Sequence, residues 1–184
     1  MKIKYCSSSY RSIYNKGFFT DTVSRKLIIC GDLLDRGKEA LKMQELILHL
    51  MHNQDIILIR GNHEDLALEF LAHANNYLGD KLYLPFTHHY RNGTVDSFLQ
   101  LTGISLSNAM SDIPAFVKKA RATAYVRNII PAMKDYFETE HYVFVHGWIP
   151  CLTDRCTHRP REFYYNPKWR EASPADWEDA RWYN

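Results

Sequence analysis

Short apolar runs and one long helical period organise the first part of the chain. Leu27–Cys30 and Ile56–Ile59 are each four residues rich in isoleucine and leucine, which is typical of short β-strands. Between them, residues 38–54 carry apolar side chains at helical spacing, namely Leu41, Leu46, Ile47, Leu50 and Met51. A strand, a helix and a strand within this length predict a right-handed βαβ unit with parallel strands.

The rest of the chain predicts a largely helical middle and one more strand. The predicted elements are helices at Asp65–Tyr77 and Val95–Leu101, an aromatic loop at Leu82–Gly93, a helix over residues 112–138 and a third strand at Tyr142–Val145. Pro131 is expected to kink or break the last of these helices. Residues 1–24 are ambiguous, and the tail over residues 155–184 has no clear period. We expect one domain over residues 1–184 with a helical insertion at about 80–138.

Composition and charge exclude several classes of partner. With 184 residues, 46% apolar and 24% charged, the chain is ordinary for a single soluble domain. Its net charge is only +2 and its lysines and arginines are scattered, so we expect no nucleic-acid partner. No apolar run approaches the length of a membrane span, and the N-terminus has no apolar signal-peptide core. A cytoplasmic protein without a membrane partner is expected.

Four cysteines are too few and too scattered to form a disulfide scaffold. Cys30 ends a predicted strand and is expected to behave as a small apolar residue. Cys151 and Cys156 lie in a loop beside His146 and His158. Two interpretations stay open for that loop, a zinc site or free thiols in a reducing cytosol.

Three polar residues each follow an apolar, strand-like run. Asp32 follows the first run, Asn62 the second and His146 the third. If the three strands are parallel and end together, their loops share the rim at which ligands bind in open α/β sheets. A carboxylate, an amide oxygen and an imidazole on that rim are a plausible set of metal ligands.

The same loops carry side chains that suit a phosphate ester. Asp35 lies three residues after Asp32 and can orient a neighbour, and Arg36 offers a planar guanidinium to phosphate oxygens. Neighbouring residues often face opposite ways, so His63 can face a substrate while Asn62 binds metal. Arg60 either binds phosphate or forms a structural ion pair. Glu64 is expected to be structural, as a charge at the start of a helix. His88 and His89 either line the pocket or are satisfied surface histidines.

Three motifs in order carry a resemblance to a known family. They read GDLLDRG at residues 31–37, GNHE at 61–64 and VHGW at 145–148. Together they resemble the calcineurin-like metallophosphoesterases, and within them the phosphoprotein-phosphatase (serine/threonine phosphatase) branch. The resemblance implies an α/β fold, a calcineurin-like sandwich with a mixed β-sheet and flanking helices.

The resemblance also implies roles for the matching residues. Asp32 would bridge two divalent metal ions, and Asn62 and His146 would hold the second ion. Asp35 would pair with His63, which would act as general acid toward the leaving alkoxide. Arg36 and Arg60 would hold the phosphate.

The implied activity is hydrolysis of phosphate monoesters by a metal-activated hydroxide. Substrates would be small phosphoesters or phosphoserine and phosphothreonine in proteins. The mixed nitrogen and oxygen ligands suit manganese, with iron or zinc as alternatives, and one or two ions per chain. A dinucleoside polyphosphate hydrolase shares these motifs and is the enzymatic alternative.

The chain departs from the family pattern in two places. The family opens with an Asp-x-His motif, whereas the first aspartate here is Asp21 and the first histidine is His49. A late Gly-His ligand is also missing, and His158 is a poor substitute for it. The second metal keeps three of four ligands, whereas the first keeps only Asp32. We therefore expect a shortened family member with doubtful activity, or a non-catalytic protein that binds a phosphorylated ligand.

Overall fold

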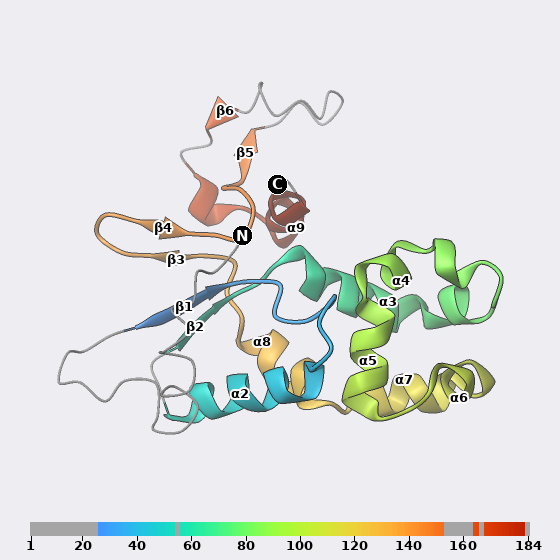
Figure 1. Ribbon diagram of the computed structural model, residues 1–184. Helices are drawn as coiled ribbons and strands as arrows, with labels where there is room; N and C mark the ends of the chain where they lie inside the picture. The colour runs from blue at the N-terminus through green and yellow to red at the C-terminus, as the bar shows by residue number, and fades with distance from the viewer. Residues whose placement is uncertain (1–25, 54–55, 153–163, 166–167, 183–184) are drawn as a thin grey trace.

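The protein is seen in a computed structural model that describes residues 26–53, 56–152, 164–165 and 168–182. The described chain is mixed α/β, with small sheets and with most of its helices grouped at one side of them (Figure 1). Within the described residues, none of the helices combines the length and the apolar character that crossing a bilayer requires.

The βαβ unit predicted from the apolar pattern is confirmed. Strands β1 (Leu27–Cys30) and β2 (Ile56–Ile59) pair in parallel, with Leu27 opposite Ile56 and Cys30 opposite Ile59. Helix α2 (Ala40–Asn53) connects them, and Ile47 and Leu50 on its inner face are almost completely buried. Because β1 and β2 are parallel and in register, the loops that follow them leave the same end of the sheet.

Two residues separate the end of β2 from helix α3 (Asn62–Leu78), the longest described helix. Its buried face includes Ala67, Phe70, Leu71 and Leu78, which belong to one apolar core shared with the helices of the middle segment. The helix carries its polar, chemistry-bearing residues in its first turn. It therefore presents them at the carboxyl end of β2.

The middle of the chain is helical, in shorter pieces than expected. Its elements are η1 (Leu84–Phe86), α4 (His88–Asn92), α5 (Thr94–Thr102), α6 (Leu106–Ser111), α7 (Ile113–Arg121), the π-helical turn η2 (Tyr125–Ile129) and α8 (Ile130–Ala132). The expected loop at Leu82–Gly93 contains two of these helices, since Thr87 caps α4 with its side chain. Left-handed glycines end α4 and α5, at Gly93 and Gly103.

The long helix expected over residues 112–138 is wrong in its second half. The chain turns after α7, forms η2 immediately before Pro131, and leaves the helical conformation at Met133. Proline has no N–H to continue the turn before it, which accounts for the interruption between η2 and α8. Phe137–Glu138 are then strand β3 rather than the end of a helix.

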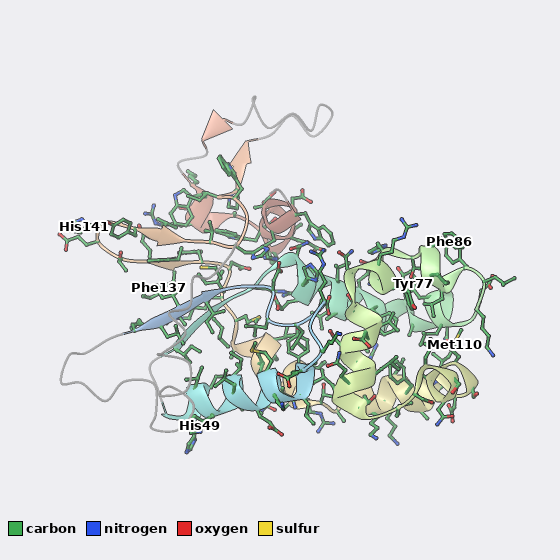
Figure 2. The ribbon with its side chains drawn as sticks, in the orientation of Figure 1. His49, Tyr77, Phe86, Met110, Phe137 and His141 are labelled. Atoms are coloured by element: carbon green, nitrogen blue, oxygen red, sulfur yellow. The ribbon has the colours of Figure 1, made fainter. Side chains whose placement is uncertain are left out.

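The third strand is not parallel to the first two, contrary to the prediction from the sequence. Strand β4 (Val143–Phe144) pairs antiparallel with β3, in a hairpin closed by a hydrogen bond from the backbone N–H of Thr139 to the carbonyl of Tyr142. The free edge of β2 is taken instead by Lys134, which forms a parallel bridge with Ile59. The hairpin lies beside β1, with Lys26 over the ring of Phe137 (Figures 1 and 2).

A third small sheet and one helix complete the described chain. Strands β5 (Cys151–Leu152) and β6 (Tyr164–Tyr165) are antiparallel, followed by η4 (Trp169–Glu171) and α9 (Pro174–Trp182). The tail, in which the sequence has no clear period, thus contributes a helix whose Trp177 is buried against Tyr136 and Trp169. The described strands form three two-stranded sheets in place of the expected single mixed sheet.

Candidate functional site

The loop after β1 has an unusual backbone. Gly31, Asp32, Asp35 and Arg36 all have positive φ, at 71°, 56°, 70° and 57°. For non-glycine residues this left-handed conformation costs on the order of 1–3 kcal/mol each and persists only where the surroundings impose it. Such conformations cluster at functional sites, and here they direct the polar side chains of one short loop in different directions.

The structure brings Asp32, Asn62 and His146 together. Nε2 of His146 lies 3.0 Å from Oδ1 of Asn62 and 3.4 Å from Oδ1 of Asp32. The three residues come from the loop after β1, the first position of α3 and the segment after β4. Their convergence does not need the three parallel strands expected from sequence, because the β3–β4 hairpin delivers His146 to the end of β1.

The chemistry of these three atoms suits a metal cation. Nδ1 of His146 lies 2.9 Å from the carbonyl oxygen of Cys30, which only accepts hydrogen bonds, so Nδ1 carries the proton. Nε2 then has a lone pair that faces the lone pairs of two oxygens. A cation among the three satisfies all of them, and the carbonyl partner fixes the imidazole in the ligand tautomer.

His63 and Asp35 form a hydrogen-bonded pair beside this group. Nδ1 of His63 lies 2.7 Å from Oδ2 of Asp35, and both side chains are more than 90% buried. The hydroxyls of Thr94 and Ser97 on α5 donate to the two oxygens of Asp35, each at 2.7 Å. The Asp35 carboxylate is thus held by α5 while it accepts from His63.

This pairing changes the acidity of the imidazole. The hydrogen bond to Asp35 raises the pKa of His63 above its usual value, and burial acts in the opposite direction. A carboxylate that accepts from Nδ1 stabilises the imidazolium form and leaves Nε2 as the atom that can exchange a proton. The pair therefore has the arrangement of a general acid with its orienting carboxylate.

Glu64 holds the two loops together. Its fully buried carboxylate accepts hydrogen bonds from the backbone N–H groups of Asp32, Leu33 and Gly61, at 3.0, 2.9 and 2.7 Å. The hydroxyl of Tyr125 donates a further bond at 3.2 Å. Burial raises the pKa of Glu64, and the backbone N–H groups oppose that shift. Glu64 thus has a structural role at the start of α3, and it also links α3 to the loop after β1.

Two glycines allow the loops to come this close. A Cβ on Gly31 would lie 2.5 Å from Nδ1 of His146 and 2.6 Å from Cα of Gly61. A Cβ on Gly61 would lie 2.5 Å from Oδ1 of Asp32. All three distances are shorter than real Cβ contacts, so the glycines of the GD and GN dipeptides are a steric requirement of this site.

The two arginines lie in different environments. Arg36 is exposed and donates from its guanidinium to Oδ1 of Asn92, which leaves other N–H groups for an anion. Arg60 pairs with Asp65 at 2.7 Å, and its Nε is buried without a hydrogen-bond partner. Asp65 also binds Arg181 of α9 at 2.7 Å. Of the two interpretations of Arg60, the structural ion pair is the one visible here.

Other residues named from the sequence lie elsewhere. His88 is exposed, but His89 is fully buried and neither ring nitrogen has a hydrogen-bond partner, so the satisfied surface histidine expected there is wrong for His89. The stretch before Asp21, where the family's Asp-x-His motif was sought, and His158 lie outside the described residues.

Sequence reasoning missed Thr94, Ser97 and Tyr125. Thr94 and Ser97 are one helical turn apart, and both are buried on a helix whose neighbours are apolar. Two polar residues one helical turn apart on the apolar face of a predicted helix could have indicated a buried polar contact. Tyr125 lies 61 residues from Glu64 and carried no comparable local pattern.

Comparison with known proteins places the chain by family. A family model described as calcineurin-like phosphoesterase matches residues 20–181. The comparisons with curated proteins and with solved structures gave no significant match. The matched range contains the Asp32, Asn62 and His146 group and the Asp35–His63 pair.

Proposed function

Because the chain belongs to the calcineurin-like phosphoesterase family, we propose that it hydrolyses phosphate monoesters with a divalent metal ion. The observation that carries the proposal is the convergence of Asp32, Asn62 and His146 beside the Asp35–His63 pair. Metal ligands alone occur at structural sites. A buried carboxylate–imidazole pair next to them is what acid catalysis requires.

Asp32, Asn62 and His146 would hold the metal ion. When bound, a divalent cation supplies positive charge to phosphoryl oxygens and acidifies a water molecule for attack on phosphorus. Two oxygens and one imidazole suit manganese best, with iron or zinc as alternatives. Asp32 is the residue in a position to be shared with a second ion, since its side chain is 39% exposed.

His63 would protonate the leaving oxygen of the ester. Asp35 accepts from Nδ1, so the proton available for transfer is on Nε2. Asp35 does not need to touch the substrate, because its part is to orient the imidazole and stabilise its cation. Thr94 and Ser97 in turn orient Asp35.

Arg36 would bind the phosphate. Its guanidinium is exposed, on the same loop as Asp32, and Asn92 fixes one side of it. The planar group suits two oxygens of a phosphoryl group at once. Arg60 is proposed as a second contact to the phosphate. It would make this contact while it stays paired with Asp65.

The first experiment is hydrolysis of p-nitrophenyl phosphate with added manganese, comparing the unmodified chain with Asp32→Asn and His63→Asn. We expect His63→Asn to lower kcat by about 10²- to 10⁴-fold, the usual range for a general acid. Asp32→Asn should abolish the response to manganese. Glu45→Gln and His141→Asn are the controls, since both residues are exposed and lie outside the motif loops, on α2 and at the turn of the β3–β4 hairpin.

The outcomes separate catalysis from binding. Activity that both site variants lose and both controls keep supports the proposal. Folded protein with no activity above the site variants would overturn it and favour a protein that only binds phosphoesters.

For the substrate, we propose phosphoserine or phosphothreonine in proteins, on the basis of the GDLLDRG and GNHE motifs, with small phosphoesters as the broader class. The values of kcat/KM on a phosphoserine peptide and on a dinucleoside polyphosphate test this. A preference for the second substrate would reassign the enzyme to polyphosphate hydrolysis.

A further inference from the structure

A second group of metal-binding side chains lies away from the candidate active site. Among the residues that the structure describes, one group of three His, Cys, Asp or Glu side chains has its ligand atoms within 4.8 Å of one another, and it consists of Glu69, His88 and His89. Glu69 is on α3, and the two histidines begin α4, which lies beside α3 (Figure 1). None of the three belongs to the motif loops.

His89 is the unexplained member of this group. Its ring is fully buried, and neither Nδ1 nor Nε2 has a hydrogen-bond partner. A buried imidazole normally donates from one nitrogen and accepts at the other, so two unused nitrogens require a reason. The unused nitrogens make this ring a candidate ligand for a metal ion.

The carboxylate of Glu69 faces one nitrogen of each histidine, and the two rings lie against each other with centroids 4.1 Å apart. Its Oε1 lies 3.7 Å from Nε2 of His89, and its Oε2 lies 3.6 Å from Nε2 of His88. These separations are too long for hydrogen bonds. They are close to the distance of about 3.3 Å that separates two ligands of a tetrahedral zinc ion with bonds of about 2.0–2.1 Å.

The surroundings hold the group in this arrangement. The hydroxyl of Tyr77 (Figure 2) donates to Oε1 of Glu69 at 3.0 Å. The Tyr77 ring packs edge-on against His89, with ring centroids 4.2 Å apart. Phe70 covers His89 from the core side, at 5.7 Å between centroids. Tyr77 thus orients one ligand by its hydroxyl and another by its ring, as the outer groups of metal sites do.

Access from solvent is also present. The side chains of His88 and Glu69 are 51% and 41% exposed, whereas His89 has no exposure. An ion can therefore enter from the surface and bind the buried nitrogen. Three protein ligands leave one position for water.

We propose that Glu69, His88 and His89 form a second metal site, for a divalent transition-metal ion of the zinc type, separate from Asp32, Asn62 and His146. Two imidazoles and one carboxylate are a ligand set that zinc takes readily. The ion would join α3 to α4, and α4 leads directly into α5, which carries Thr94 and Ser97. The site would thereby stabilise the helical wall that positions Asp35.

The test is a zinc titration by calorimetry, in a background where Asp32→Asn and His146→Asn disable the candidate active site. We expect one zinc ion per chain. Glu69→Gln and His88→Asn should each weaken its binding by at least about 100-fold, and Tyr77→Phe by about 10-fold as an orienting partner. His52→Asn, an exposed histidine on α2, is the matched control and should bind zinc unchanged.

Thermal unfolding gives an independent readout. Zinc should raise the Tm of the background protein and leave that of Glu69→Gln unchanged. Both Glu69 and His88 are partly exposed, so their variants should fold, which circular dichroism checks. The proposal is overturned if the background protein binds no zinc, or if Glu69→Gln and His88→Asn bind it as well as the background does.

Discussion

The buried carboxylate of Glu64 accepts a 3.0 Å hydrogen bond from the backbone N–H of Asp32, 32 positions earlier in the chain. The same carboxylate accepts from Leu33 and from Gly61, so it ties the loop after β1 to the start of α3. Asp32 and Asn62, which face the same ring nitrogen of His146, are thereby held in place by a residue that does not touch it. The geometry of the candidate metal site depends on a carboxylate behind it.

Glu64→Gln should therefore damage the site without removing any ligand. An amide has one accepting oxygen, so its NH2 group would face backbone N–H donors on one side. We expect a loss of about 2–4 kcal/mol in the free energy of unfolding, because buried donors lose their acceptor. Urea unfolding measures it. Tyr125→Phe is the control, since it removes one hydroxyl donor and should cost about 0.5–1.5 kcal/mol. Equal losses in the two variants would contradict this account.

Gly31→Ala should be more harmful than its backbone conformation alone explains. Both Gly31 and Gly103 have positive φ, at 71° and 65°. A Cβ on Gly31 would collide with His146 and Gly61, whereas one on Gly103 would meet nothing within 4 Å. Gly103→Ala should cost about 1–2 kcal/mol of stability and keep activity.

The loss of stability in Gly31→Ala beyond that in Gly103→Ala then measures how much the close approach of the two loops matters. We also expect Gly31→Ala to lose manganese-dependent hydrolysis of p-nitrophenyl phosphate. If both alanine variants behave alike in stability and activity, the contact between Gly31 and His146 is unimportant.

Asp35→Asn should move the pH dependence of the reaction. Protonated His63 is the proposed acid, so activity falls as pH rises through its pKa. The hydrogen bond to Asp35 raises that pKa, and its removal should shift the alkaline fall of kcat/KM to lower pH. Asparagine tolerates the left-handed φ of 70° at this position, so the loop should keep its shape.

The matching measurement is a pH profile of kcat/KM for Asp35→Asn and the unmodified chain. An alkaline limb that stays in place, with kcat/KM reduced evenly at every pH, would mean that Asp35 only supports the loop. The same profile for Ser97→Ala should show a smaller shift in the same direction, because Ser97 orients Asp35.

Arg181→Met should destabilise the chain by about 1–3 kcal/mol, less than the loss of about 3–5 kcal/mol when a buried charge is left unpaired, because Arg60 still pairs with Asp65. Arg181 and Asp65 are both buried, and Arg181 also donates to Asp135 at 2.9 Å. Thermal unfolding measures the loss. The control is Glu39→Gln in the exposed Glu39–Lys42 pair, which should change stability by less than about 1 kcal/mol. A loss below that of the control would show that α9 is held by its tryptophans alone.

The sequence by itself determined the elements whose signals are local. The apolar runs at Leu27–Cys30 and Ile56–Ile59 and the helical period between them predicted β1, α2 and β2 closely, because neighbouring residues decide these structures. The motif loops also named the residues that converge, Asp32, Asn62 and His146. The residue types and their places after apolar runs were enough for that.

Only the tertiary structure decided the partners of those elements. The segment before His146 pairs with β3, since a four-residue connection favours a hairpin and Lys134 already bridges to β2. Thr94, Ser97 and Tyr125 reach the site from helices 59–62 residues away from their partners. His89 is buried because α4 packs on α3. Contacts between distant segments depend on which surfaces pack together, and no local pattern encodes that choice.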